Sequence, residues 1–455
     1  MMLNKTRIAC FIAIAGVLSG CGLFEDDPVG GLRIDVDVPL EATTELVSDP
    51  EDESVRYYTH EPRPNVSRPL QMPPPARVAD WVSVNANIAH DAGHHALRSN
   101  PTLVWAADIG ENTSSKQRLS AAPVVAGGRV FAMDADSTVS AFNRSGERLW
   151  SNSLVPDEAD SGEASSGGLG YGSGRLFATS GYGVLRAIDP GSGATLWTQR
   201  FEYPAIYPPV AFGNSVYLVT LGNYAWSINA TTGRRNWRVE STHALGASTG
   251  EASTAIGGGG AFVPFPSGEV IAANAANGRI VWTHFVGGTK DPDAVRTIAG
   301  VAASPVLSGN RLYVSNLAGV LSALDASTGI PIWSVPEGSA NAVLAVGDSV
   351  FAINDSSELV RLSAINGQRI WSVQLPHFTR ESVRRRQEVH DHYGPLLVGG
   401  RILVASSDEE IRMYSPESGE LVSSLRISGG AAATPAVVEG TLYVVSDNGR
   451  LNAYR

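Results

Sequence analysis

Two histidine-rich clusters contain the side chains of this chain that are best suited to chemistry. The first is His90-Asp91-Ala92-Gly93-His94-His95, and the second is His390-Asp391-His392. Imidazole and carboxylate groups are ordinary zinc ligands, but neither spacing defines a coordination geometry. Histidines in such segments more often cap turns or pack against neighbours, so we predict no metal site.

The sequence offers no other constellation that would carry out a reaction. Arg384-Arg385-Arg386 indicates an exposed polar loop, either simply solvated or able to bind an acidic partner surface. No Ser-His-Asp arrangement can be deduced, and no glycine-rich phosphate loop opens a helix. A basic patch with interleaved aromatic residues, as nucleic acid binding requires, is also missing from the sequence. We therefore predict no catalytic residue, no cofactor, no small-molecule substrate and no nucleic acid partner.

The first 21 residues predict export. Lys5 and Arg7 precede an apolar run at residues 8–17, which is too short to span a bilayer stably. The run ends in Leu18-Ser19-Gly20-Cys21, which resembles a bacterial lipobox. We expect residues 1–20 to be a signal peptide and Cys21 to become a lipidated N-terminus.

The residue after Cys21 bears on the destination of the lipoprotein. Under the bacterial sorting rule an Asp at this place favours retention in the inner membrane, whereas Gly22 permits transfer to the outer membrane. The expected location is the periplasmic face of the outer membrane. The other cysteine, Cys10, would leave with the leader, so the mature chain would form no internal disulfide and would depend on core burial for stability.

The formal net charge of −11 is concentrated in one segment. Residues 22–53 contain eleven acidic residues against Arg33 alone, so residues 54–455 are nearly neutral. Six prolines follow within residues 62–75 and favour an extended, stiff chain. We assign residues 21–78 to an acidic, proline-rich tether that holds the body away from the membrane.

One pattern recurs from Trp105 onward and decides the fold. Its clearest copy, residues 311–333, has short alternating β-rich runs punctuated by Gly, Asp and Asn turns, and it closes at Trp333. The other copies are residues 130–150, 176–197, 216–237, 261–282, 350–371, 402–423 and a truncated copy at 442–454.

A further strand precedes each copy, as in Ala122-Pro123-Val124-Val125. Four strands per unit without helical periodicity are typical of β-propeller blades. The last unit lacks its tryptophan strand, and the unclaimed one is Thr102-Leu103-Val104-Trp105. We therefore predict an all-β, eight-bladed propeller of four-stranded antiparallel blades over residues 79–455. Its N- and C-terminal strands would join to close the ring, and each tryptophan would fill the space between neighbouring blades.

The copies resemble the quinoprotein-like, or PQQ-type, propeller repeat, most clearly from Ala323 to Trp333. With the lipobox, residues 79–455 are similar to the BamB family, the lipoprotein subunits of the outer-membrane β-barrel assembly (BAM) machinery. The resemblance implies a periplasmic scaffold without enzymatic activity that binds the POTRA domains of BamA. It also implies contact with other BAM subunits and, as possible partners, unfolded outer-membrane proteins.

Within that family the BamA contact lies on two neighbouring loops, which here correspond to residues 243–251 and 287–303. Gly250-Glu251 matches the Gly-Glu step of the first loop, but the family's Leu-x-Leu-Arg is replaced and the two acids of its second loop are missing. The resemblance therefore predicts that the same two loops contact the partner, but it does not predict the side chains that make the contact. The predicted contact residues are Gly246, Ala247, Ser248, Thr249, Glu251, Arg296, Thr297, Gly300 and Ala302.

The same repeat occurs in quinone-dependent alcohol dehydrogenases, so an enzyme is the first alternative. That chemistry needs an ion held by carboxylate and amide oxygens, a catalytic aspartate and a sandwiched cofactor. Those enzymes usually add a vicinal Cys-Cys, whereas the mature chain would keep only Cys21. A propeller adaptor of another envelope complex is the second alternative.

Overall fold

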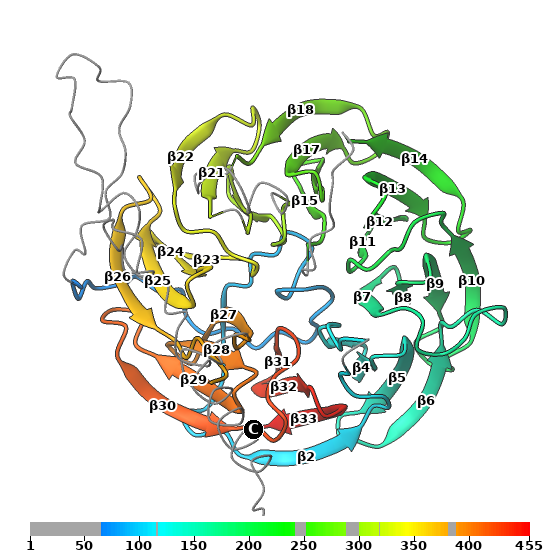
Figure 1. The fold of residues 1–455 in the computed structure, drawn as a ribbon, viewed down its shortest axis with the longest axis horizontal. Coiled ribbons are helices and arrows are strands. Elements are labelled where there is room, and N and C mark those ends of the chain that lie inside the picture. The colour runs from blue at the N-terminus through cyan, green and yellow to red at the C-terminus, as the bar shows by residue number, and fades with distance from the viewer. Residues whose placement is uncertain (1–64, 115–116, 242–251, 288–299, 318, 381–387) are drawn as a thin grey trace, which may run out of the picture. The chain divides into compact units, whose positions relative to one another are not determined.

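The computed structural model describes residues 65–114, 117–241, 252–287, 300–317, 319–380 and 388–455. These residues form eight sheets arranged in a ring (Figure 1). The described residues include no helix long and apolar enough to cross a membrane. The predicted eight-bladed, all-β propeller is confirmed.

Each of the first four blades is a meander whose first strand lies nearest the axis and whose last strand lies at the rim (Figure 1). The short first strands pair with the second through two-residue turns that contain glycine. Blade 1 comprises β3 (Val124–Ala126), β4 (Arg129–Met133), β5 (Thr138–Asn143) and β6 (Arg148–Ser153); blade 2 comprises β7 (Ser166–Gly172), β8 (Arg175–Ser180), β9 (Val184–Ile188) and β10 (Thr195–Arg200); blade 3 comprises β11 (Val210–Phe212), β12 (Ser215–Thr220), β13 (Tyr224–Asn229) and β14 (Arg235–Glu240); blade 4 comprises β15 (Ala255–Gly257), β16 (Gly260–Pro264), β17 (Glu269–Asn274) and β18 (Ile280–Phe285).

The remaining blades repeat this plan, with one additional strand in blade 7. There the two-residue β1 (His94–His95) runs parallel to the first strand, β27. Blade 5 comprises β19 (Val306–Ser308), β20 (Arg311–Ser315), β21 (Leu321–Asp325) and β22 (Pro331–Val335); blade 6 comprises β23 (Leu344–Val346), β24 (Ser349–Ile353), β25 (Glu358–Ser363) and β26 (Arg369–Gln374); blade 7 comprises β27 (His392–Val398), β28 (Arg401–Ser406), β29 (Glu410–Tyr414) and β30 (Leu421–Arg426); blade 8 comprises β31 (Ala436–Val438), β32 (Thr441–Ser446), β33 (Arg450–Tyr454) and β2 (Leu103–Asp108).

Blade 8 closes the ring as the sequence predicts. Strand β2 pairs antiparallel with β33, with Leu103 opposite Tyr454 and Asp108 opposite Arg450. The rim strand of blade 8 therefore comes from the start of the repeat region and its three inner strands from the end. This pairing covers the backbone edge that an open ring would expose for aggregation.

The tryptophans lie between blades, as predicted. Each packs against an aromatic ring of its own blade, with centroids 5.8–6.0 Å apart. Each indole N–H also donates to a backbone carbonyl in the next blade, as Trp282 does to Ala326 at 3.0 Å. Indole rings suit this place because a buried tryptophan needs one polar partner and a large apolar surface. The residues are Trp105, Trp150, Trp197, Trp237, Trp282, Trp333 and Trp371.

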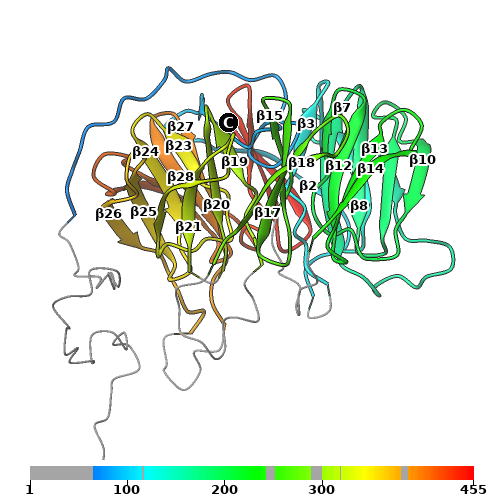
Figure 2. The same cartoon turned by 90° about the horizontal axis from the view of Figure 1, so that it is seen from above.

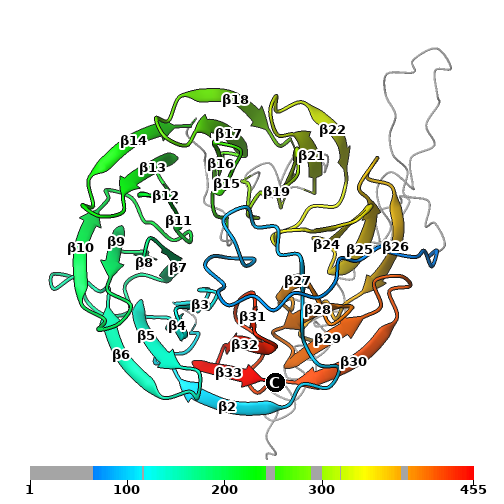
Figure 3. The same ribbon diagram turned by 180° about the vertical axis from the view of Figure 1, so that it is seen from behind.

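Residues 65–102, which we call the strap, cross one face of the ring before the chain enters β2 (Figures 2 and 3). Their backbone bonds to the inner strands of several blades, including Trp81 to Val125, Ile88 to Ile256 and Ala89 to Leu307. Trp81 is fully buried. Residues 65–78, which we expected within the tether, thus belong to the same compact unit as the propeller.

Arginines from the blades hold both ends of the strap. The fully buried Arg361 donates to the carbonyls of Arg68 and Pro69 and, in blade 7, to that of Pro416. Arg401 donates to the carbonyls of Ser99 and Arg98 in the same way. These charge-assisted bonds satisfy backbone groups that no sheet partner reaches.

Candidate partner-binding site

The two connections that the sequence singled out leave from the face opposite the strap. They join β14 to β15 and β18 to β19, so they lie between blades 3, 4 and 5. The predicted contact residues Gly246, Ala247, Ser248, Thr249, Glu251, Arg296 and Thr297 lie outside the described residues. The structure does describe the ends of both connections.

The first connection begins at Ser241 and ends at residues 252–254. The Ser241 amide donates to the carbonyl of Asn223 at 3.0 Å, and its hydroxyl donates to the carboxylate of Glu269. At the far end, the Ser253 hydroxyl donates to the carbonyl of Pro208 at 2.8 Å. Both serines are buried, so the ends of this connection are fixed to blades 3 and 4.

The second connection is fixed mainly by Asn316 of blade 5, which is fully buried. Its amide nitrogen donates to the carbonyls of Val286 at 2.9 Å and Gly287 at 3.2 Å. Its amide oxygen accepts a hydrogen bond from Val320 at 2.9 Å. The first two bonds position the start of the connection. The bond from Val320 holds the Asn316 side chain in blade 5.

The two connections also contact each other. The Ser253 amide donates to the hydroxyl of Ser304 at 2.9 Å, and both residues are buried. Loops that leave a rigid base at fixed positions are suited to binding a partner. The serine pair therefore joins the described ends of two connections that are separate in the sequence, and we call Ser253, Ser304 and Asn316 with the ends that they fix the platform.

Two of the predicted contact residues fall within this platform. Gly300 and Ala302 are buried, and the intervening Val301 forms a bridge with Asn316. Both residues therefore lie in the buried end of the second connection and do not face solvent. Sequence reasoning missed Ser253, Ser304 and Asn316, because nothing in the repeat distinguishes them from the polar residues of other turns.

The histidine clusters have structural surroundings. His90 is fully buried and bonds through Nδ1 to the carbonyl of Pro305 at 2.9 Å, and burial lowers its pKa to about 4. His94 bonds to the carbonyl of Pro73 at 2.6 Å, and His95 packs against Trp81 with ring centroids 4.9 Å apart. Burial also lowers the pKa of His95. His90 thus ties the strap to the residue before β19, and His94 also accepts a hydrogen bond from the amide of Gly400 in blade 7 at 2.9 Å.

The second cluster is similar. His392 bonds through its two ring nitrogens to the Ser406 hydroxyl at 2.7 Å and the Pro376 carbonyl at 2.8 Å, and burial lowers its pKa. Arg384-Arg385-Arg386 lies outside the described residues. Among the residues that are described, no three His, Cys, Asp or Glu side chains come together in a way that could hold a metal ion.

Eight four-stranded sheets closed into a ring by the pairing of β2 with β33 define the chain as an eight-bladed β-propeller. The chain belongs to the family described as outer membrane protein assembly factor BamB, whose model matches residues 93–160, 135–373 and 380–455. A curated relative of that name from Shewanella oneidensis is 25% identical over 360 residues, which cover 77% of this chain and 88% of the relative.

Solved structures agree on the fold. The crystal structure of BamB from Moraxella catarrhalis superimposes with a TM-score of 0.64 at 17% identity, covering 78% of this chain and all of that one. Quinohemoprotein alcohol dehydrogenase from Comamonas testosteroni also has a TM-score of 0.64, at 15% identity, covering 83% of this chain and 81% of that one. At these identities the likeness concerns the fold alone, so it does not choose between a scaffold and an enzyme.

Proposed function

We propose that this protein is a scaffold of the outer-membrane β-barrel assembly complex that binds BamA and aids the insertion of barrel proteins. The observation that carries the proposal is the match to the assembly-factor family over most of the chain. The platform made by Ser253, Ser304 and Asn316 supports it, because it fixes the ends of both connections where the family resemblance places the partner.

The scaffold would act without catalysis. The support for this is that curated relatives are named as assembly factors. Its work would be binding, with rigid blades holding loops at fixed positions for the POTRA domains of BamA and other BAM subunits. Unfolded barrel proteins are further possible partners.

We also propose that Cys21 carries the lipid that anchors the protein to the periplasmic face of the outer membrane. Cys21 lies outside the described residues, so this proposal rests on the lipobox of the sequence. Growth with labelled palmitate should label the native chain and leave Cys21→Ser unlabelled. Label in the Cys21→Ser chain would refute the assignment.

Crosslinking tests the partner and the face together. A photoreactive residue at Ser248 or Arg296 should give a covalent adduct with BamA in cells, whereas one at the exposed Arg98 of the strap should not. Deletion of the gene should also lower the amount of outer-membrane porins. If BamA neither co-purifies with the protein nor crosslinks to any position, the proposed function is wrong.

A further inference from the structure

Blade 3 departs from the repeat at two facing positions, and the departure builds a pocket. Trp226 on β13 lies opposite Arg238 on β14. In every other blade the rim residue at this register is Ser, Thr or Ala, and its partner is not aromatic. The equivalent pairs are Ser140–Ser151, Arg186–Thr198, Ile271–Thr283, Ser322–Ser334, Val360–Ser372, Arg412–Ser424 and Asn452–Ala106.

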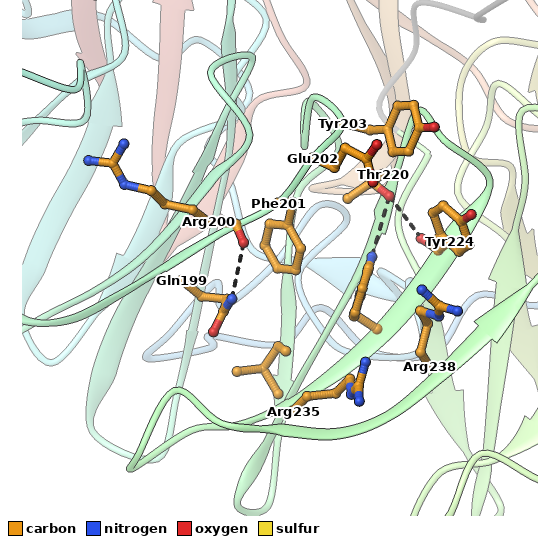
Figure 4. A pocket seen from close by; sticks show the side chains of 11 residues that line it. Gln199, Arg200, Phe201, Glu202, Tyr203, Thr220, Tyr224, Arg235 and Arg238 are labelled. Atoms are coloured by element: carbon orange, nitrogen blue, oxygen red, sulfur yellow. Dashed lines mark hydrogen bonds between the residues drawn. The ribbon is translucent and has the colours of Figure 1, made fainter. Parts of the chain in front are cut away.

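The two residues line a cavity of about 450 Å³ between blades 2 and 3 (Figure 4). Four aromatic rings follow one another along it. Phe201 and Trp226 have centroids 5.1 Å apart, Trp226 and Tyr224 6.0 Å, and Tyr224 and Tyr203 5.9 Å. Each of the four rings keeps part of its surface open to solvent, so together they offer an apolar wall to a ligand.

Guanidinium groups complete the pocket. Arg238 lies 4.6 Å from the ring centre of Tyr224 and 5.5 Å from that of Trp226, a cation–π arrangement that holds the group in place. Arg235 extends from the same strand and is exposed (Figure 4). Within the described part of the chain neither arginine forms an ion pair, whereas Arg200 is paired with Glu158. Two cationic forks therefore remain available beside the rings.

We infer that this pocket binds a segment of a partner protein that brings an aromatic side chain next to a carboxylate. A carboxylate accepts two parallel bonds from a guanidinium fork, and an aromatic side chain stacks on the exposed rings. Tryptophan, tyrosine and arginine are also the residues that dominate protein–protein binding energy. An anionic lipid surface fits less well, because its headgroups would pair with the two arginines but would not use the row of aromatic rings beside them.

The position of the pocket points the same way. Its strand β14 leads directly to Ser241, where the first connection of the partner-binding platform begins. A partner on that platform could extend a segment into the pocket without crossing another blade. The inference rests on the proposed scaffold function only for which partner supplies the segment. The chemistry of the pocket is argued from the residues that line it.

Fluorescence anisotropy of a labelled heptapeptide, Gly-Ser-Phe-Glu-Glu-Ser-Gly, tests the inference on the full chain. Saturable binding is expected, weakened at least tenfold by Arg238→Ser or Trp226→Ser, which install residues found at these positions in other blades. Arg279→Gln, an exposed arginine of blade 4, should leave binding unchanged as the charge-matched control. Replacing Phe by Ala, or both Glu by Gln, in the peptide should weaken binding similarly.

Several results would overturn the inference. These are no saturable binding, equal binding by all variants, or capture of phosphatidylglycerol vesicles that depends on Arg238 and not on Trp226. The melting temperature of each variant shows whether it folds, and Arg238→Ser at an exposed position keeps the test valid if Trp226→Ser does not. If BamA still co-purifies while the peptide fails to bind, the pocket assignment falls and the scaffold function stands.

Discussion

Acid should loosen the strap through His90, and the size of the effect can be worked out from its surroundings. His90 is fully buried, its Nδ1 bonds to Pro305, and its Nε2 has no hydrogen-bond partner among the described residues. Protonating Nε2 would place a charge in this site without an acceptor, which is why its pKa lies at about 4 instead of 6.5.

The direction of the change in the free energy of unfolding follows from where His90 binds its proton. Between pH 6.5 and 4 the unfolded chain holds a proton on this imidazole and the folded chain does not, so acidification favours unfolding. Relative to neutral pH, the free energy of unfolding should fall by about 2 kcal/mol at pH 5 and about 3 kcal/mol at pH 4 through His90 alone. The loss is negligible once the pH is about one unit or more above the unfolded pKa.

Urea unfolding of the native chain and of His90→Asn isolates this contribution, because other titrating groups cancel in the difference. Asn tolerates the positive φ of 59° at this position and cannot be protonated. The stability advantage of the native chain over His90→Asn should shrink by about 3 kcal/mol between pH 7.5 and pH 4. A difference that stays constant over this range would refute the reasoning.

Three other perturbations have expected outcomes. Arg361→Met should lower the free energy of unfolding, measured in urea, by about 3 kcal/mol, because it leaves buried carbonyls of the strap and of blade 7 without a hydrogen-bond donor. An unchanged unfolding midpoint would contradict this role. Gly329→Ala should cost about 2 kcal/mol, since the residue has φ of 73° and an added Cβ would lie 2.6 Å from Trp282, whereas Gly309→Ala, with open space around it, should cost about 1 kcal/mol; equal losses would show that the ring contact is unimportant. Asn316→Ala should reduce co-purified BamA several-fold at equal amounts of folded protein, and full recovery would separate this side chain from partner binding.

The ring could be predicted from the sequence because its determinants are local and repeated. Every blade has a glycine turn and alternating strands within about 50 residues, and all blades except blade 7 also have the tryptophan, so each copy supports the others. The closure followed from one unpaired tryptophan strand at Trp105. The structure confirms the blade repeat and the ring closure. In both, a tryptophan of one blade packs against the next blade through the same contact.

The strap could not be predicted in this way. It has no repeating pattern, and its partners, such as Ile256 for Ile88 and Leu307 for Ala89, lie more than 150 residues away in the sequence. Prolines and histidines in it indicated an extended chain and structural rings, but not where these would pack. Its buried arginine contacts depend on tertiary geometry, because Arg361 looks like any strand residue until its neighbours are known.

Only part of the candidate site could be predicted from the sequence. Family resemblance gave the two connections, but the polar residues that fix their ends are found by geometry, and Gly300 and Ala302 are buried supports. The pocket of blade 3 did carry a sequence signal. Aligning the eight copies at Trp226 and Arg238 would have shown an aromatic and an arginine where the other blades have smaller rim residues.

The shared construction of blade 8 makes folding kinetics depend on the whole chain. Strand β2 and its partner β33 are more than 340 residues apart, so the final sheet forms only after every intervening blade has been synthesised. Contacts this distant slow folding, because a long loop must close before they stabilise the chain. A chain cut short before β33 would keep seven intact sheets. Strand β2 would then lack its partner, and its exposed backbone edge would be prone to association.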